Sequence, residues 1–294
     1  MQHITLNTGA SMPMLGFGVF QVRDKQECED SIYEAIRIGY RLIDTAAVYT
    51  NEDAVGAACR RAIADGICTR EDLFVTSKLW VTDMNDYDSA MAGIDASIEK
   101  LGLGYIDLYL QHQSLNDYFS AWRAMTDAYR EGKLRNIGVS NFYPNILTNF
   151  CEVMEVTPAV NQVELHPYYT QEAAIDNMRA YGVVPEAWAP LGGGRYNPFE
   201  DEGFKAIAEA HGKTVGQVLL RWNIQRGVVV IPKSTHAERI AENFDVWDFE
   251  LTDGEMAFVA SHDMGYTGSR AKHFDPDFVR MVLNRDSRKQ AAKS

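Results

Sequence analysis

The chain has 294 residues, of which 46% are hydrophobic and 23% charged, so it has a globular composition and is long enough for one large α/β domain. Its formal net charge of −13 at pH 7 argues against a general affinity for nucleic acid or anionic membrane, because both are bound through a positive surface potential. A bound anion would therefore need a local cluster of basic side chains.

The N-terminal residues and the cysteines bear on where the protein works. Residues 1–6 have neither the basic region nor the apolar stretch of a secretory signal, and no later run approaches the ~20 apolar residues of a membrane span. The cysteines form no C-x-x-C pair and no dense framework, which favours reduced thiols: Cys28, Cys59, Cys68 and Cys151. We expect a cytoplasmic protein without a membrane partner. No helix pattern demands a partner chain, so we expect a monomer.

The first forty residues are predicted to form a hairpin, a strand and a helix. Residues 4–13 alternate around a turn at 7–10, which indicates a small β-hairpin that acts as a plug or a lid. Residues 15–20 are predicted to be the first strand, in which Gly18 allows backbone or ligand to approach closely. The Gly-x-Gly here lacks the third glycine of a dinucleotide fingerprint. Asp24 and Glu27 form a capping box before a helix to about residue 38.

Helices and strands then alternate along the rest of the chain. Further strands are expected to end at Asp44, Lys78 and near His112, and to cover residues 134–139, 159–163, 183–189 and 228–231. Helices are expected at 52–65, 86–101, 117–131, 144–152, 171–181 and 201–211. Capping boxes at Thr214/Gln217, Thr235/Glu238 and Thr252/Glu255 are expected to open three more.

Eight strands alternating with helices predict a (β/α)₈ TIM barrel with an N-terminal β-hairpin and extra helices. A doubly wound sheet is the rival, but it would need a glycine-rich first turn. We expect one barrel domain over residues 1–294. From about residue 262 the sequence becomes irregular, which predicts a C-terminal substrate loop and a polar, mobile tail at 284–294.

Three successive apolar runs each end in an ionisable side chain. The strand at residues 42–43 leads to Asp44, the next leads to Lys78, and the third leads to His112. Because ligands bind at the carboxyl ends of parallel strands, these side chains and the nearby Tyr49 predict one shared site.

These four residue types suit proton donation to a carbonyl oxygen. A free phenol has a pKa near ~10, and a neighbouring ammonium moves that value toward the working range, so Lys78 is expected to tune Tyr49. Asp44 would hold the ammonium and keep it protonated. His112 would donate a hydrogen bond to the oxygen that Tyr49 protonates. Hydride addition to a carbonyl builds negative charge on that oxygen.

The same residues stand within longer motifs. These are GYRLIDTA at 39–46, KLW at 78–80, GVSNF at 138–142, NQVELHP at 161–167 and IPKS at 231–234. On these motifs, over residues 4–260, the chain resembles the aldo-keto reductase superfamily. At WAPLG, residues 188–192, it is most similar to the bacterial group that contains the 2,5-diketogluconate reductases.

The resemblance implies a role for each matching position. Tyr49 would be the proton donor, Lys78 and Asp44 its tuning pair, and His112 the group that orients the carbonyl. The nicotinamide carboxamide would be hydrogen-bonded by Ser140, Asn141 and Gln162, with Trp188 stacked on the ring. Further cofactor contacts are expected from Gly18, Val19, Phe20, Asp44 and Leu191.

The adenosine end of the cofactor is expected after the eighth strand. Lys233, Ser234 and Arg239 supply two cations and a hydroxyl at the start of a helix, a frequent phosphate site in barrels. The arginine fork suits a 2′-phosphate, so NADPH is expected rather than NADH. Remaining contacts are expected from Thr235, Glu242 and Asn243. A solvated acidic helix face is the alternative for Glu242 and Asn243.

The substrate pocket is expected to be lined by aromatic and apolar side chains: Phe20, Val48, Tyr49, Trp80 and His112. Aromatic walls around a polar pair suit a modest carbonyl compound. Glu164 and His166 offer two potential metal ligands without a third, so no metal is expected.

The leading hypothesis is therefore an NADPH-dependent reductase of aldehydes and ketones. An aldolase that forms a Schiff base on Lys78 is one alternative, although the charge kept on the amine by Asp44 opposes it. A non-catalytic barrel that binds nucleotide to sense redox state is the other.

Overall fold

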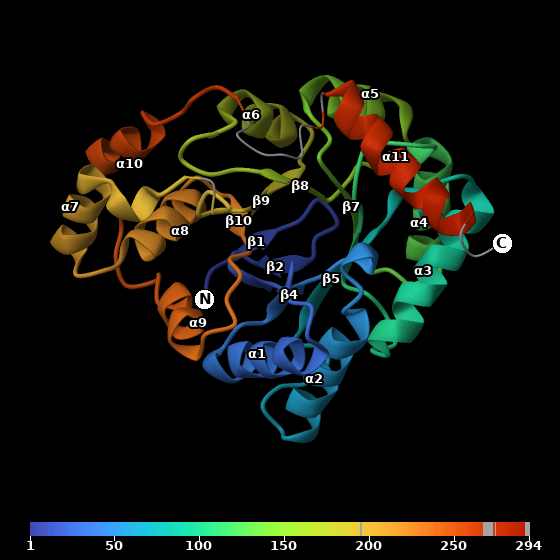
Figure 1. Ribbon diagram of the computed structural model, residues 1–294, viewed down its shortest axis with the longest axis horizontal. Helices are drawn as coiled ribbons and strands as arrows, with labels where there is room; N and C mark the ends of the chain where they lie inside the picture. The colour runs from blue at the N-terminus through green and yellow to red at the C-terminus, as the bar shows by residue number, and fades with distance from the viewer. Residues whose placement is uncertain (195, 267–272, 274, 292–294) are drawn as a thin grey trace.

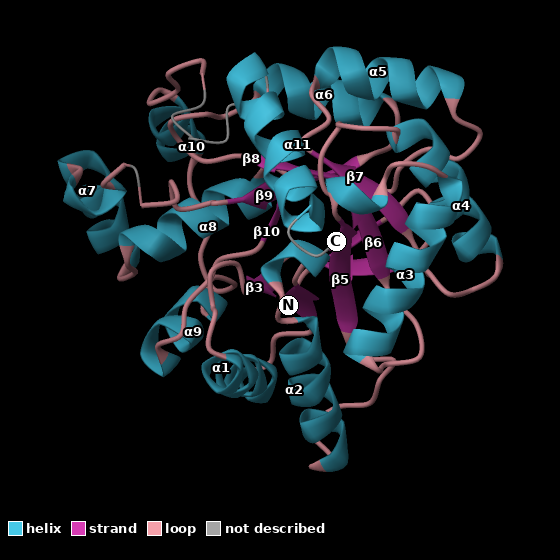
Figure 2. Cartoon of the chain, turned by 45° about the vertical axis from the view of Figure 1, so that its right-hand side comes forward, coloured by secondary structure: helices cyan, strands magenta, loops and turns pink. Residues whose placement is uncertain are grey.

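The centre of the molecule is a ring of eight parallel strands. The computed structural model describes residues 1–194, 196–266, 273 and 275–291, with backbone only over 284–291. The strands are β3 (Gly16–Gly18), β4 (Leu42–Asp44), β5 (Phe74–Leu79), β6 (Leu108–Gln111), β7 (Ile137–Ser140), β8 (Val160–Glu164), β9 (Val184–Trp188) and β10 (Val229–Val230). They pair in sequence order, each parallel to the next. The predicted (β/α)₈ barrel is confirmed (Figures 1 and 2).

The ring closes where β10 returns to β3. Leu15 forms a parallel bridge with Val230, and the Gly18 amide donates to the carbonyl of Pro232 at 3.0 Å. A Cβ atom at Gly18 would lie 3.0 Å from the Ile231 carbonyl oxygen, closer than most real Cβ contacts. The close backbone approach predicted for this glycine is therefore the seam of the barrel.

Helices surround the strands on the outside (Figure 2). They are α1 (Lys25–Ile38), α2 (Glu52–Ala64), α3 (Tyr87–Leu101), α4 (Tyr118–Arg130), α5 (Pro144–Val153), α6 (Glu172–Ala180), α7 (Glu202–His211), α8 (Val215–Gln225), α9 (Ala237–Phe244), α10 (Asp253–Ala260) and α11 (Pro276–Ala291). Short 3₁₀ turns η1 (Ala47–Tyr49), η2 (Val81–Asp83) and η3 (Pro198–Glu200) follow strands β4, β5 and β9. No helix among the described residues is long and apolar enough to cross a membrane.

The predicted capping boxes have different outcomes. Those that open α8 and α10, at Thr214 and Thr252, show both reciprocal hydrogen bonds. Asp24 caps α1 by accepting from the Glu27 amide at 2.8 Å. The box at Thr235 is wrong: α9 begins two residues later, and the hydroxyl of Ser234 accepts from the His236 amide at 3.1 Å, which extends the preceding turn.

The N-terminal hairpin closes the lower end of the barrel. Strand β1 (His3–Thr5) pairs antiparallel with β2 (Ser11–Pro13), and Met12 is fully buried against residues at the amino ends of the barrel strands, such as Leu42 and Phe74. In Figure 1 the blue hairpin lies across the centre of the ring. The hairpin is thus a plug at the end opposite the strand carboxyl ends, and the alternative of a lid is wrong.

The inside of the barrel changes from apolar to polar along its axis. Because strand side chains alternate between faces, each strand sends every second residue inward. The inward residues next to the plug are apolar on four of the strands: Leu42, Phe74, Val160 and Val184. One step further along the strands the inward residues include Asp44, Thr76, Gln162 and Glu186, all buried. A polar layer thus underlies the mouth.

The C-terminal segment is more regular than predicted. Helix α11 forms from Pro276 to Ala291, so the expectation of irregular chain after residue 262 is wrong there. Phe278 packs against the main core, Val282 is buried, and α11 contacts η2 beside the barrel mouth. Residues 292–294 of the predicted tail lie outside the described residues.

Candidate active site

A buried ion pair joins the ends of β4 and β5. Lys78 Nζ donates to Asp44 Oδ1 at 2.6 Å, to Oδ2 at 2.8 Å, and to the carbonyl oxygen of Thr45 at 2.9 Å. Both side chains are buried. Burial is the largest single influence and lowers the pKa of Lys78, but the attraction of Asp44, together with those of Tyr49 and Glu186, outweighs it, and the pKa of Lys78 lies above its ordinary value. The amine is therefore held as an ammonium ion.

Tyr49 lies beside this pair on η1. Lys78 Nζ is 5.2 Å from the centroid of the Tyr49 ring. Burial raises the pKa of the phenol, whereas the charge of Lys78 and a hydrogen bond with it lower that pKa, and the net result is a raised value. The effect of Lys78 has the predicted sign. The sequence did not indicate that burial would outweigh it.

Aromatic rings pack around the ring of Tyr49. The ring of His112 lies edge-on to Tyr49 with centroids 5.6 Å apart, and Trp80 lies edge-on to His112 at 5.0 Å. Phe20 lies 4.9 Å from Tyr49 and is 55% exposed, and Val48 is also exposed. Phe20, Tyr49, His112 and Trp80 are thus joined by ring contacts, and Val48 precedes Tyr49 on η1.

His112 is kept neutral by its surroundings. Burial, then the positive charge of Lys78 and the ring of His273, hold its pKa well below the ordinary value. A neutral imidazole carries one N–H donor, so it can donate a single hydrogen bond to a ligand in the mouth.

The side chains predicted to hold a carboxamide form a connected network. Ser140 Oγ donates to the Gln162 carbonyl oxygen at 2.8 Å, and Asn141 Nδ2 donates to Ser140 Oγ at 3.1 Å. Trp188 Nε1 donates to Asn141 Oδ1 at 3.0 Å. Gln162 Nε2 donates to Asp44 Oδ2 at 2.9 Å, which joins this network to the Lys78 ion pair.

One buried carboxyl in this network was not identified from the sequence. Glu186 on β9 is fully buried, and its Oε2 accepts from Gln162 Nε2 at 3.0 Å. Burial, and then the negative charge of Asp44, raise the pKa of Glu186 to about 8. The strand pattern of β9 indicated that Glu186 points into the barrel, because Val184, Glu186 and Trp188 lie on the same face of the strand.

Two exposed cations follow the eighth strand. Lys233 follows β10 and Arg239 lies in the first turn of α9, and neither has a carboxylate partner among the described ion pairs. Ser234 and Asn243 are buried nearby, while Glu242 accepts from the hydroxyl of Thr214 at 2.7 Å. Unpaired cations beside a helix start suit a phosphate group. The remaining residues predicted for the cofactor lie buried at the seam, at Gly18 and Val19, or partly buried, at Leu191 and Thr235.

His273 adds a second imidazole near the mouth. The ring of His273 lies 6.4 Å from that of Trp188 and 5.8 Å from that of Tyr143. The segment was predicted to approach the substrate, but no motif singled out His273.

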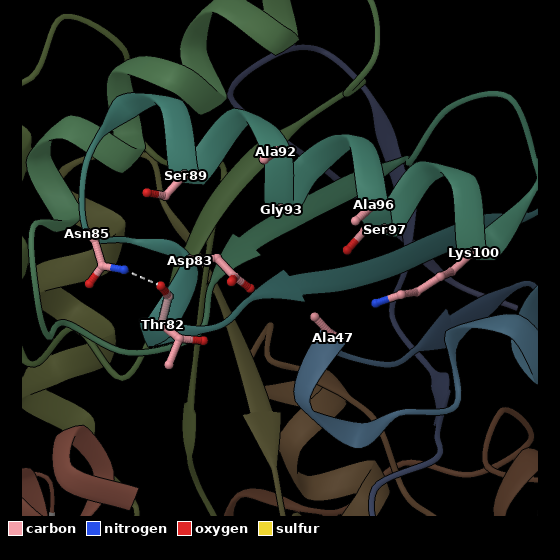
Figure 3. Close-up of a pocket in the computed structure, with 10 residues that line it drawn as sticks. All are labelled: Ala47, Thr82, Asp83, Asn85, Ser89, Ala92, Gly93, Ala96, Ser97 and Lys100. Atoms are coloured by element: carbon pink, nitrogen blue, oxygen red, sulfur yellow. Dashed lines mark hydrogen bonds between the residues drawn. The ribbon is translucent and has the colours of Figure 1, made fainter. Parts of the chain in front are cut away.

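A separate cavity of about 440 Å³ lies outside this mouth (Figure 3). Its walls come from η1, η2, α3 and the turn before α3: Ala47, Thr82, Asp83, Asn85, Ser89, Ala92, Gly93, Ala96, Ser97 and Lys100. None of the four predicted catalytic side chains lines it. Its polar groups are largely satisfied within the protein, as Ser97 Oγ is by the Tyr109 hydroxyl at 2.9 Å.

Glu164 and His166 bond to each other, with His166 Nε2 at 3.2 Å from Glu164 Oε1. Within the described part of the chain, no group of three potential metal ligands comes together.

Comparisons with known proteins show the family of the chain. The model of the Aldo/keto reductase family matches residues 14–264. A morphine 6-dehydrogenase of Pseudomonas putida is 44% identical over 276 residues, covering 89% of this chain and 91% of the relative. A glyoxal reductase of Bacillus subtilis is 44% identical over 254 residues, covering 86% of this chain and 90% of the relative. The crystal structure of a Bombyx mori aldo-keto reductase in complex with NADP superposes with a TM-score of 0.88 at 37% identity, covering 94% of this chain and 98% of that one.

Proposed function

The chain belongs to the aldo/keto reductase family and is an NADP(H)-dependent oxidoreductase, and we propose that it reduces aldehydes and ketones to alcohols with Tyr49 as the general acid. The observation that carries this proposal is the buried Lys78 ammonium, which contacts Asp44 on one side and Tyr49 on the other. Similarity to a dehydrogenase of morphine and a reductase of glyoxal at equal identity supports the reaction class without selecting a substrate.

The residues of the mouth fit the cofactor. The polar network of Ser140, Asn141 and Gln162 would bind the carboxamide, and Trp188 would lie against the ring. Lys233 and Arg239 would bind phosphate, which favours NADPH over NADH because Arg239 is exposed and free to pair with a 2′-phosphate. When bound, the reduced nicotinamide supplies the hydride.

Side chains of the protein then bind the substrate oxygen and neutralise the negative charge that develops on it. The neutral His112 donates a hydrogen bond that orients the carbonyl. The raised pKa of Tyr49 keeps the phenol protonated at neutral pH, so the acid is available. As the proton leaves, the Lys78 ammonium stabilises the developing phenolate, and Asp44 keeps Lys78 charged.

The substrate would be a modest carbonyl compound. Phe20, Val48 and Trp80 give the mouth an apolar wall, with His273 beside Trp188. The expected C-terminal substrate loop from about residue 262 falls partly on residues 267–272 and 274, which lie outside the described residues. We further propose a monomeric enzyme built as one barrel domain. The four free thiols suit a reducing compartment, so we place it in the cytoplasm.

The test replaces Tyr49 with Phe, which removes only the hydroxyl. Carbonyl-dependent NADPH oxidation should fall by about 10²-fold or more, while NADPH binding, followed by tryptophan fluorescence, should remain. A panel of aldehydes, α-dicarbonyls and keto-sugars covers the substrate classes. Unchanged turnover in the Phe variant would refute the assignment of the acid.

The other hypotheses have weaker support. A Schiff base needs a neutral amine, and the raised pKa of Lys78 opposes one. Covalent trapping of a substrate on Lys78 by borohydride would favour the Schiff-base hypothesis. A non-catalytic sensor would bind NADPH tightly and turn over no member of the panel.

A further inference from the structure

Glu186 has no part in the mechanism above, although it lies within the polar layer. It stands beside Gln162 in the register of β8 and β9, with its side chain fully buried. Its Oε2 accepts one hydrogen bond, from Gln162, and its Oε1 has no partner among the described residues. A carboxyl buried with so few partners is costly and calls for a physical explanation.

The contacts of Gln162 supply one. Its Nε2 carries two N–H groups, and these donate to Asp44 Oδ2 at 2.9 Å and to Glu186 Oε2 at 3.0 Å. Both donors are therefore occupied, and acceptors on two different strands fix the plane of the amide. Gln162 Oε1 must then point away from both carboxyl groups. With Glu186 removed, one donor would lose its acceptor and the amide could rotate about its last torsion, which is broad.

We propose that Glu186 is a positioning residue for the cofactor, which fixes the Gln162 amide so that Gln162 Oε1 faces the nicotinamide carboxamide. This inference rests on the proposed function, because the family resemblance assigns Gln162 to the carboxamide. Glu186 itself touches neither cofactor nor substrate and acts through Gln162.

The same carboxyl also affects the acid. The charged or titratable groups that face it are Asp44 of β4, Lys78 of β5 and Tyr49 of η1. The flanking strands β8 and β10 bring Gln162 and Val229 alongside, and neither is charged. Burial and the charge of Asp44 raise the pKa of Glu186 to about 8, so the carboxyl gains negative charge as the pH rises. Its negative charge then raises the pKa of Tyr49 and keeps the phenol protonated to higher pH.

The binding experiment compares truncating and conservative variants by NADPH titration of the full-length protein. Glu186→Leu is expected to weaken NADPH binding about 3- to 10-fold, the loss that follows when one hydrogen bond no longer holds an amide. Glu186→Gln should recover most of that loss, because its amide oxygen can accept the same bond. Thr76→Val is the matched control: Thr76 lies in the same buried layer, and its hydroxyl has no partner among the described residues.

A double-variant cycle separates positioning from general damage. If Glu186 acts through Gln162, Glu186→Leu should add no further weakening in a Gln162→Leu background, whereas independent effects would multiply. Thermal unfolding checks that each variant folds. Glu186→Ala serves as a second truncation, since it removes the acceptor without introducing a branched side chain into the layer.

The pH profile gives a readout that a structural role would not move. In Glu186→Gln the alkaline limb of kcat should shift down by about 0.5 pH unit or more, because the charge that raises the pKa of Tyr49 is gone. Two results would overturn the positioning role. One is equal NADPH affinity in the parent and the truncated variants; the other is a double variant of Glu186 and Gln162 whose loss of affinity is the product of the two single losses. A parent protein that binds NADPH but reduces no carbonyl compound would refute the proposed function. The double-variant cycle would still test the positioning role, because it measures only NADPH affinity.

Discussion

Replacing Asp44 with Asn tests the electrostatic core of the site. The carboxylate accepts from Lys78 at both oxygens, 2.6 and 2.8 Å, and from Gln162 at Oδ2. An amide has one acceptor oxygen, so its NH₂ group must face one of these donors. The variant thus loses the negative charge and leaves a donor unpaired next to a buried ammonium.

The cost follows from these contacts. Breaking a buried ion pair by removing one partner costs about 3–5 kcal/mol of the free energy of unfolding. Lys78 should also lose its charge, because burial lowers its pKa and Asp44 is the largest influence that raises it. A neutral Lys78 no longer stabilises the Tyr49 phenolate, so kcat should fall by about 10²-fold or more.

The pH dependence of stability gives the sharpest readout. In the parent, the folded pKa of Lys78 lies above 10.5, so its contribution is fully present at neutral pH and is lost only as pH rises through that folded value. In Asp44→Asn the folded pKa falls below the unfolded one. The unfolded state then binds more protons, and stability should rise with pH. Urea unfolding at pH 6 to 9, with kcat from NADPH absorbance, measures both effects. A variant within about 1 kcal/mol of the parent, with flat pH dependence and kcat within threefold, would refute this reasoning.

Two further predictions concern opposite ends of the barrel. Arg239→Ala should weaken NADPH binding about 10-fold or more and change NADH binding little, because a charge-assisted bond to a 2′-phosphate is lost. Equal losses for both nucleotides in fluorescence titrations would contradict this assignment. Met12→Ala should cost about 2–5 kcal/mol in urea unfolding, because Met12 is fully buried in the plug. Its kcat should stay near the parent value, and a large loss of kcat would mean that the plug and the mouth are coupled.

Much of the fold could be predicted from the sequence because its local signals agree. Apolar runs of strand length alternate with capped helices, and the structure places eight strands in the predicted order. The errors fall where a local pattern has several solutions. Thr235 and Glu238 have the spacing of a capping box, but Ser234 forms the turn instead. Among the described side chains of helix α11, Phe278 and Val282 pack against the core, and the sequence from residue 262 did not show this helix.

The candidate site could be predicted in part. Asp44, Lys78 and His112 each end an apolar run, and that pattern marks the mouth of a parallel barrel. Glu186 was missed because it lies inside an apolar run, where one carboxyl does not change the strand prediction. The raised pKa of Tyr49 was missed because burial depends on rings from other loops, such as Phe20 and His112, whose approach no local pattern reveals.

The division of the barrel interior into an apolar lower layer and a polar upper layer has a consequence for how this protein tolerates change. In the lower layer the effect of a substitution on stability depends mainly on side-chain volume, and a change in one side chain can be compensated by a change in its neighbour. In the upper layer the effect depends on whether each hydrogen-bond donor and acceptor keeps a partner. A substitution that hardly changes the shape of the side chain, such as Asp44→Asn, can therefore cause a large loss of stability and activity. Thermostability can therefore be sought around the hairpin without a change in turnover, whereas a substitution at the strand ends changes stability and turnover together.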